Sequence, residues 1–118
     1  MDNLEQLSDE GLVACLKRDD RAAFEAIYER YASQLFRYLG DRMDTREACE
    51  QTLIDVFVLL WSNRHSINEG QLREYLFSTL RYKIFKYIRD NPTSHLYAEI
   101  MNHFQKYQYG NDKEEKGN

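Results

Sequence analysis

The sequence predicts an all-α fold, a compact helical bundle of about four helices, from three observations. Its 118 residues fit one domain with one modest hydrophobic core. It contains one proline and five glycines, and Gly70, Gly110 and Gly117 fall in loop-like or tail segments. Helix interiors exclude both residue types. Apolar residues recur at spacings of three and four along the chain, and no strand-like alternation persists.

The first two helices are predicted from their capping residues and apolar faces. Ser8 precedes two acidic residues, a pattern that favours a helix start. Leu12, Val13 and Leu16 form the first apolar face. Asp19 or Asp20 begins the second helix, and Gly40 ends it. The core face of the second helix is expected to contain Phe24, Ile27, Tyr28, Tyr31, Leu35, Tyr38 and Leu39.

Two longer helices follow, separated by a polar loop. Asp44 or Thr45 caps a third helix that runs to about Ser62, with core residues Leu53, Val56, Phe57, Leu60 and Trp61. Residues 63–70 form the loop. A fourth helix runs from about Gln71 to Arg89 and ends before Pro92, because proline disfavours a helical residue before it. Its core face is predicted to contain Leu76, Phe77, Leu80, Ile84, Tyr87 and Ile88.

The C-terminal part of the chain is predicted to differ from the domain over residues 1–92. Residues 93–110 are expected to form a linker-like segment, in which helical spacing places four apolar residues on one face and indicates an extra helix: Leu96, Ile100, Phe104 and Tyr107. Residues 111–118 are polar, and we expect them to be disordered.

Several function classes are disfavoured by composition. No apolar run approaches the roughly 20 residues of a membrane span, and the acidic N-terminus lacks a signal-peptide pattern, so a cytoplasmic location is expected. Cys15 and Cys49 lack a metal-ligand spacing and are interpreted as reduced thiols. His65 has no acid partner or nucleophile nearby in sequence. We therefore expect no metal, no cofactor and no enzymatic activity.

The net charge of -4 is unevenly distributed. Residues 1–60 carry seven basic and thirteen acidic side chains, whereas residues 61–91 carry six basic and three acidic ones. Contact with a polyanion is therefore expected only in the second of these segments.

The third helix carries apolar residues on the side opposite its predicted core stripe. That side contains Gln51, Ile54, Asp55, Val58 and Ser62. A helix that is apolar all round is either buried within the fold or covered by a partner. The sequence leaves both interpretations open.

The loop and the fourth helix carry groups that suit single-stranded nucleic acid. Asn63, Arg64, His65, Ser66 and Asn68 offer donors and acceptors for the edge of an unpaired base. On the fourth helix, Tyr75, Tyr82, Lys86 and Arg89 fall on one stripe opposite the core, where rings stack on bases and cations contact phosphates. The alternatives are an ordinary connecting loop and tyrosines that lie along the surface beside solvated cations.

Three segments together resemble a known family. SDEGLVACLKRDDRAAFEAIYERYASQLFRYL, IDVFVLLWSNRHSI and LREYLFSTLRYKIFKYIR are similar to region two of bacterial extracytoplasmic-function (ECF) sigma factors, over residues 7–91. The resemblance implies a helical bundle that binds the clamp coiled coil of the largest subunit of core RNA polymerase. It also implies recognition of the minus-ten promoter element as a melted non-template strand.

The resemblance also assigns roles to individual positions. Polymerase contact falls on Gln51, Ile54, Asp55 and Val58, and base capture falls on the loop 63–70. Promoter contact on the following helix falls on Arg73, Tyr75, Tyr82, Lys83, Lys86 and Arg89. Gln51 and Ile54 depart from the acidic residue and glutamine common in the family, which would alter the clamp contact.

The chain contains no counterpart of the family's region four, a helix-turn-helix that binds duplex DNA. It is therefore expected to be either a part of a longer factor or a naturally short protein. The acidic net charge predicts weak DNA binding without polymerase. The alternative function is a stand-alone interaction module that binds polymerase or an anti-sigma factor without reading a promoter.

Overall fold

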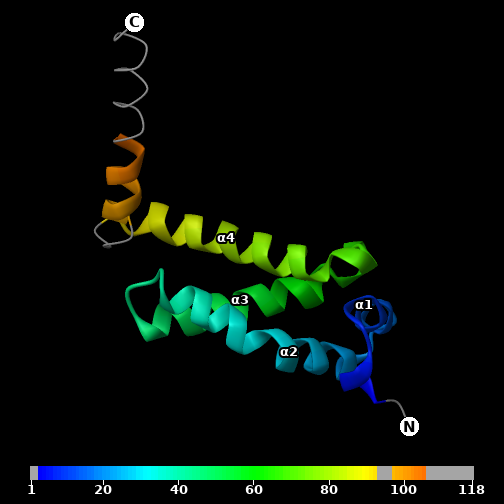
Figure 1. The fold of residues 1–118 in the computed structure, drawn as a ribbon. Coiled ribbons are helices and arrows are strands. Elements are labelled where there is room, and N and C mark those ends of the chain that lie inside the picture. The colour runs from blue at the N-terminus through cyan, green and yellow to red at the C-terminus, as the bar shows by residue number, and fades with distance from the viewer. Residues whose placement is uncertain (1–2, 93–96, 106–118) are drawn as a thin grey trace, which may run out of the picture. The chain divides into compact units, whose positions relative to one another are not determined.

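The fold, in a computed structural model, is all-α, as predicted (Figure 1). The structure describes residues 3–92 and 97–105, and this part of the chain contains no β-strand. Four α-helices are α1 (Asp9–Lys17), α2 (Arg21–Gly40), α3 (Arg46–Ser62) and α4 (Leu72–Asp90). Three short 3-10 helices are η1 (Leu4–Gln6), η2 (Arg64–Ser66) and η3 (Glu69–Gln71). Residues 97–105 are also helical.

The helices begin at the predicted capping residues. Ser8, Asp20 and Thr45 each accept a hydrogen bond from a backbone amide in the first turn, at 3.1, 2.9 and 3.0 Å. Each cap stabilises its helix by about 1 kcal/mol, since it satisfies an amide that lacks an intrahelical partner. Gly40 is the last residue of α2, as expected, but its φ is not in the left-handed region.

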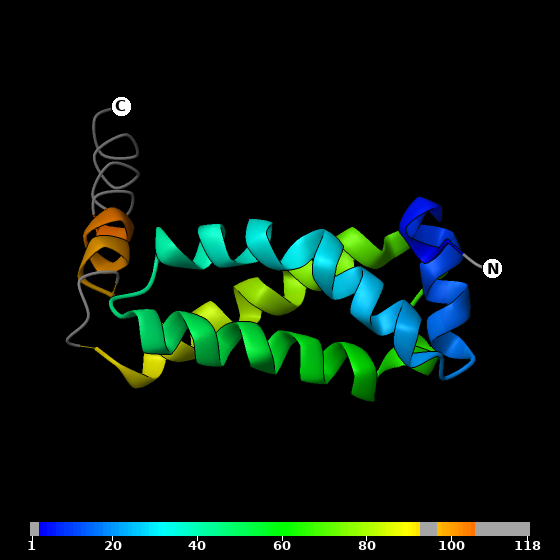
Figure 2. The same ribbon diagram turned by 90° about the horizontal axis from the view of Figure 1, so that it is seen from below.

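The chain divides into two compact units, Met1–Ile84 and Phe85–Asn118. In the first unit, α2 and α3 lie side by side and run in opposite directions (Figures 1 and 2). α1 lies at the end of this pair where α2 begins, and it packs against α2, η2 and η3. The α1 helix therefore contacts the segment that connects α3 to α4.

The core of the first unit consists mostly of the predicted apolar residues. Those that are fully or almost fully buried are Leu12, Val13, Leu16, Ile27, Tyr31, Leu35, Leu39, Leu53, Val56, Phe57, Leu60, Leu76, Leu80 and Ile84. Tyr28 is a wrong prediction, because its side chain is 42% exposed. Its ring lies at the edge of the core, with its centroid 4.9 Å from that of Phe57. Sequence reasoning also missed Ile67 and Leu72, both buried at the end of the polar loop.

The second unit contains the end of α4 and the helical residues 97–105. Ile88 is buried, whereas Phe85, Ile100 and Phe104 are exposed. Leu96 and Tyr107 of the predicted apolar face, and the predicted disordered tail 111–118, lie outside the described residues. The domain boundary at residue 92 stays a prediction. Among the described residues, no helix has the length and apolar character of a membrane span.

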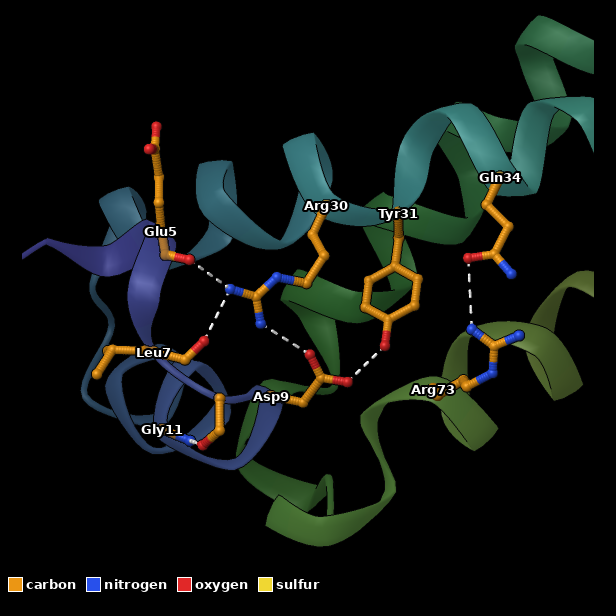
Figure 3. Close-up of polar contacts among 9 residues, drawn as sticks. Glu5, Leu7, Asp9, Gly11, Arg30, Tyr31, Gln34 and Arg73 are labelled. Carbon is orange, nitrogen blue, oxygen red and sulfur yellow. Dashed lines mark hydrogen bonds and ion pairs between the residues drawn. The ribbon is translucent and has the colours of Figure 1, made fainter.

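A polar network fixes the N-terminal segment on α2 (Figure 3). Arg30 donates to the Asp9 carboxylate at 2.9 Å and to the carbonyl oxygens of Glu5 and Leu7 at 3.0 and 2.8 Å. The Tyr31 hydroxyl donates to the other carboxylate oxygen of Asp9. Burial of the Tyr31 ring, together with the Asp9 hydrogen bond and charge, raises the pKa of Tyr31 to about 12, although Arg73 opposes the shift.

Alkaline pH should therefore weaken the fold through Tyr31. In the unfolded chain this phenol ionises near pH 10, whereas in the folded chain it ionises at about 12. The stabilisation is complete below pH 10 and is lost as the pH rises through 12. Tyr31→Phe should reduce the free energy of unfolding by about 1 kcal/mol at pH 7. The difference in free energy of unfolding between Tyr31→Phe and the wild type, measured by urea titration, should narrow between pH 10 and 12. A difference that stays constant over this pH range would contradict the role of Tyr31.

Candidate nucleic-acid and partner interface

The outward side of α3 is open to solvent. Ile54 and Val58 are each 55% exposed, which excludes burial of this side within the first unit. Gln51, in the turn before Ile54, donates an amide hydrogen bond to the Asp55 carboxylate at 3.2 Å. The four predicted polymerase-contact residues therefore form one mixed apolar and polar surface, which we call the α3 face.

A groove between α2 and α3 extends the α3 face. It has a volume of about 410 Å³ and is lined by Arg21, Phe24, Glu25, Phe57, Val58, Trp61 and Ser62. Three of its rings pack edge to face, with the centroid of Phe24 6.2 Å from Phe57 and 5.6 Å from Trp61. The contribution of α2 to this groove was missed in the sequence, because these aromatic residues were assigned wholly to the core.

The segment between α3 and α4 is an anchored loop. Ile67 is buried between η2 and η3, and Leu72 is buried where α4 begins. Asn68 caps η3 by accepting a hydrogen bond from the Gly70 amide at 3.1 Å. Its two apolar anchors hold the polar residues of the loop at defined positions.

A surface pocket lies between this loop and the first three turns of α4. Its volume is about 360 Å³, and its lining consists of Ser66, Ile67, Asn68, Gln71, Glu74, Tyr75, Ser78 and Arg81. We call it the loop pocket. Ser66, Asn68 and Tyr75 were predicted site residues, whereas the α4 residues Glu74, Ser78 and Arg81 were missed. A helical-wheel count from residue 74 would have placed them at i, i+4 and i+7 on one side of α4.

Tyr75 does not lie on a solvent-facing stripe, in contrast to the prediction. Its hydroxyl donates to the carbonyl oxygen of Leu59 at 3.1 Å and accepts from the Asn63 side-chain amide at 3.0 Å. The ring is half-buried as a result. Tyr75 thus connects α4 to the end of α3 and forms one wall of the loop pocket.

Arg64 and His65 are bound to a carboxylate from the turn between α1 and α2. Arg64 Nε donates to Asp19 Oδ1 at 2.8 Å, and His65 Nε2 lies 3.2 Å from the same oxygen. The Arg64 hydrogen bond holds the pKa of Asp19 below its usual value, and His65 acts in the same direction. His65 therefore has an acid partner, but one that is 46 positions away in the sequence.

The basic residues of α4 differ in their surroundings. Lys83 Nζ lies 3.9 Å from the Asp55 carboxylate, so a predicted DNA contact is paired with the α3 face. Arg73 donates to the Gln34 side chain at 3.3 Å (Figure 3) and lies over the Phe77 ring at 4.8 Å. Tyr82 is 58% exposed. In the second unit, Lys86 is half-buried, and exposed Arg89 lies 3.4 Å from Asp90.

No group of metal-ligating side chains occurs within residues 3–92 and 97–105. Comparisons with protein families, curated proteins and solved structures gave no match to this chain. Within the first unit, the candidate interface consists of the α3 face, the loop pocket and three basic residues of α4, Arg73, Arg81 and Lys83.

The Tyr75 hydroxyl, which joins α4 to the end of α3 beside the loop pocket, should contribute measurably to the free energy of unfolding. Tyr75→Phe leaves the Leu59 carbonyl and the Asn63 amide without this partner, so the free energy of unfolding should fall by about 1 kcal/mol. Tyr28→Phe is the matched control, since its exposed ring retains the contact with Phe57. Urea unfolding measures both, and equal stability of the two variants would contradict the assigned role.

Proposed function

We propose that this chain is a promoter-recognition module of the region-two type found in ECF sigma factors. In this role the α3 face binds the clamp coiled coil of core RNA polymerase. The loop pocket and α4 then bind the melted non-template strand of the minus-ten element. The proposal rests on the sequence resemblance together with the geometry of the loop pocket.

The single observation that carries the proposal is the loop pocket. Its lining combines a half-buried aromatic ring with amide, hydroxyl, carboxylate and guanidinium groups from the loop and α4. Proteins that hold an extruded base use the same combination, with a ring or apolar surface against the base and hydrogen bonds to its edge. The anchored backbone at Ile67 supports base capture, because a preorganised site loses less entropy on binding.

Polymerase binding would compensate for the unfavourable charge of the free chain. With a net charge of -4, the chain repels DNA at long range. Docking on polymerase places the pocket beside DNA that is already held. Binding of the captured bases then offsets unpairing, which costs a few kcal/mol for each flipped base.

The pocket predicts a DNA-specific defect in Asn68→Ala and Arg81→Ala. Each variant should lower by about tenfold the affinity of the chain–polymerase complex for a pool of single-stranded oligonucleotides with random sequence, since each removes about 1.4 kcal/mol of base contact. Fluorescence anisotropy measures this, and polymerase affinity should be unchanged.

Arg37→Ala is the matched control for Arg81→Ala, because it removes an exposed cation from α2 outside the pocket lining. An equal loss of oligonucleotide affinity in both arginine variants would contradict base capture in the pocket. It would indicate instead a general effect of charge.

The α3 face predicts a polymerase-specific defect in Val58→Asp. This substitution places a charge in an apolar contact, so binding to a recombinant clamp coiled coil should weaken at least tenfold. The exposed position predicts an unchanged fold. Val58→Thr keeps the shape of the side chain and should bind almost normally. Biolayer interferometry measures both, and wild-type affinity of Val58→Asp would exclude the α3 face as the clamp contact.

The exposed apolar side of α3 and its groove favour a second candidate, a module that binds polymerase or an anti-sigma factor only. The two functions separate in the oligonucleotide experiment. Polymerase binding without oligonucleotide capture by the wild-type complex would select the second candidate.

A further inference from the structure

Asp19 occupies a backbone position at which a glycine is expected. It is the only non-glycine residue within the described part of the chain with a positive φ, 65°. The Asp19 amide donates to Leu16 O at 2.9 Å and the Asp20 amide donates to Cys15 O at 3.3 Å. These two bonds are the Schellman ending of a helix, in which the left-handed residue is usually glycine. A side chain at this position therefore carries a conformational cost that its contacts must offset.

The contacts of that side chain lead to the loop between α3 and α4. The Asp19 carboxylate binds Arg64 at 2.8 Å and His65 at 3.2 Å. Arg64 is held on two further sides, because its Nη1 donates to the Trp61 carbonyl at 2.7 Å and its guanidinium lies 4.0 Å from the centre of the Trp61 ring. Only 19% of the Arg64 side chain is exposed. Arg64 thus acts as a strut between the α1–α2 turn and the end of α3.

Arg64 lies just before, in the sequence, the loop residues that line the loop pocket. Arg64 and His65 belong to η2, and the next residues along the chain, Ser66, Ile67 and Asn68, line the pocket. Burial of Ile67 fixes the loop in the core, and the Asp19 carboxylate fixes it through Arg64. Removing the carboxylate would leave Arg64 and His65 without their acidic partner.

We infer that Asp19 is a positioning residue for the loop pocket, acting through Arg64. The inference rests on the proposed function for its DNA readout. It reassigns Arg64 from a contact with the edge of an unpaired base to a link between the α1–α2 turn and the end of α3. A carboxylate bound to Arg64 could instead compete with a DNA phosphate for this cation, and the two roles predict opposite effects. Positioning predicts weaker DNA capture when the carboxylate is removed, whereas competition predicts stronger capture.

Asp19→Gly separates positioning from a general effect on folding. Glycine adopts the left-handed backbone without strain and removes only the carboxylate. The thermal stability should therefore fall by no more than the contribution of the Asp19–Arg64 ion pair, because relief of the backbone strain offsets part of that loss. Oligonucleotide affinity of the polymerase complex should fall about tenfold, and clamp affinity should stay unchanged. Asp19→Asn tolerates the same backbone and retains an acceptor, so it should restore part of the affinity. Asp41→Gly, in the α2–α3 connection, is the control.

Trp61 provides a readout that does not depend on DNA. It is the only tryptophan in the chain, and Arg64 stacks on its ring. Loss of the Asp19 contact should shift its fluorescence emission, and the shift should be absent in Asp41→Gly. In the double variant Asp19→Gly/Arg64→Gln, the losses of oligonucleotide affinity should be less than additive, because both remove the same strut.

The outcomes are distinct. Unchanged or increased oligonucleotide affinity in Asp19→Gly overturns the positioning role, and an increase establishes competition with phosphate. If the wild-type complex captures no oligonucleotide, the proposed function fails. The positioning role is then decided by Trp61 emission, and an unshifted spectrum in Asp19→Gly overturns it.

Discussion

The attachment of the α3–α4 connection to α1 is the constraint on which the candidate site depends. Ile67 and Leu72 are buried at this connection, and Arg64 binds Asp19 in the turn that follows α1. Together they fix where α3 ends and where α4 begins. The loop pocket exists because α4 leaves the connection beside Ser66 and Asn68. A free polar loop of the same composition would present these groups in many arrangements, with no defined cavity.

A second constraint is the division of α3 between two apolar sides. One side contributes Val56, Phe57 and Leu60 to the core, and the other leaves Ile54 and Val58 in solvent. Exposed aliphatic side chains cost free energy in water, so a second apolar side that the first unit does not cover supports the proposed contact with a partner. Asp55 lies on this side and pairs with Lys83 of α4, which links the α3 face electrostatically to the helix that we propose binds DNA.

Periodicity and capping residues were sufficient to predict the helices and most of the core. Ser8, Asp20 and Thr45 begin their helices as expected, because capping depends on groups within one turn. The site was predicted less completely. The loop and α4 were identified as the candidate surface, but Tyr75 was placed in solvent, and Glu74, Ser78 and Arg81 were overlooked. A helical wheel gives the direction of a side chain relative to its own helix, and it does not show that another element ends beside it.

By itself, the sequence determined the all-α class, the helix starts and the aliphatic stripes, since these follow from interactions between residues a few positions apart. Only the tertiary structure decided which polar residues are paired. Asp19 and Arg64 are 45 positions apart in sequence and 2.8 Å apart in space, and Asn63 and Tyr75 meet across the start of the loop. The α3 face could be proposed from spacing, but its exposure was open until the packing of α2 and α4 was known. Long-range contacts are set by how whole helices pack, which no local pattern encodes.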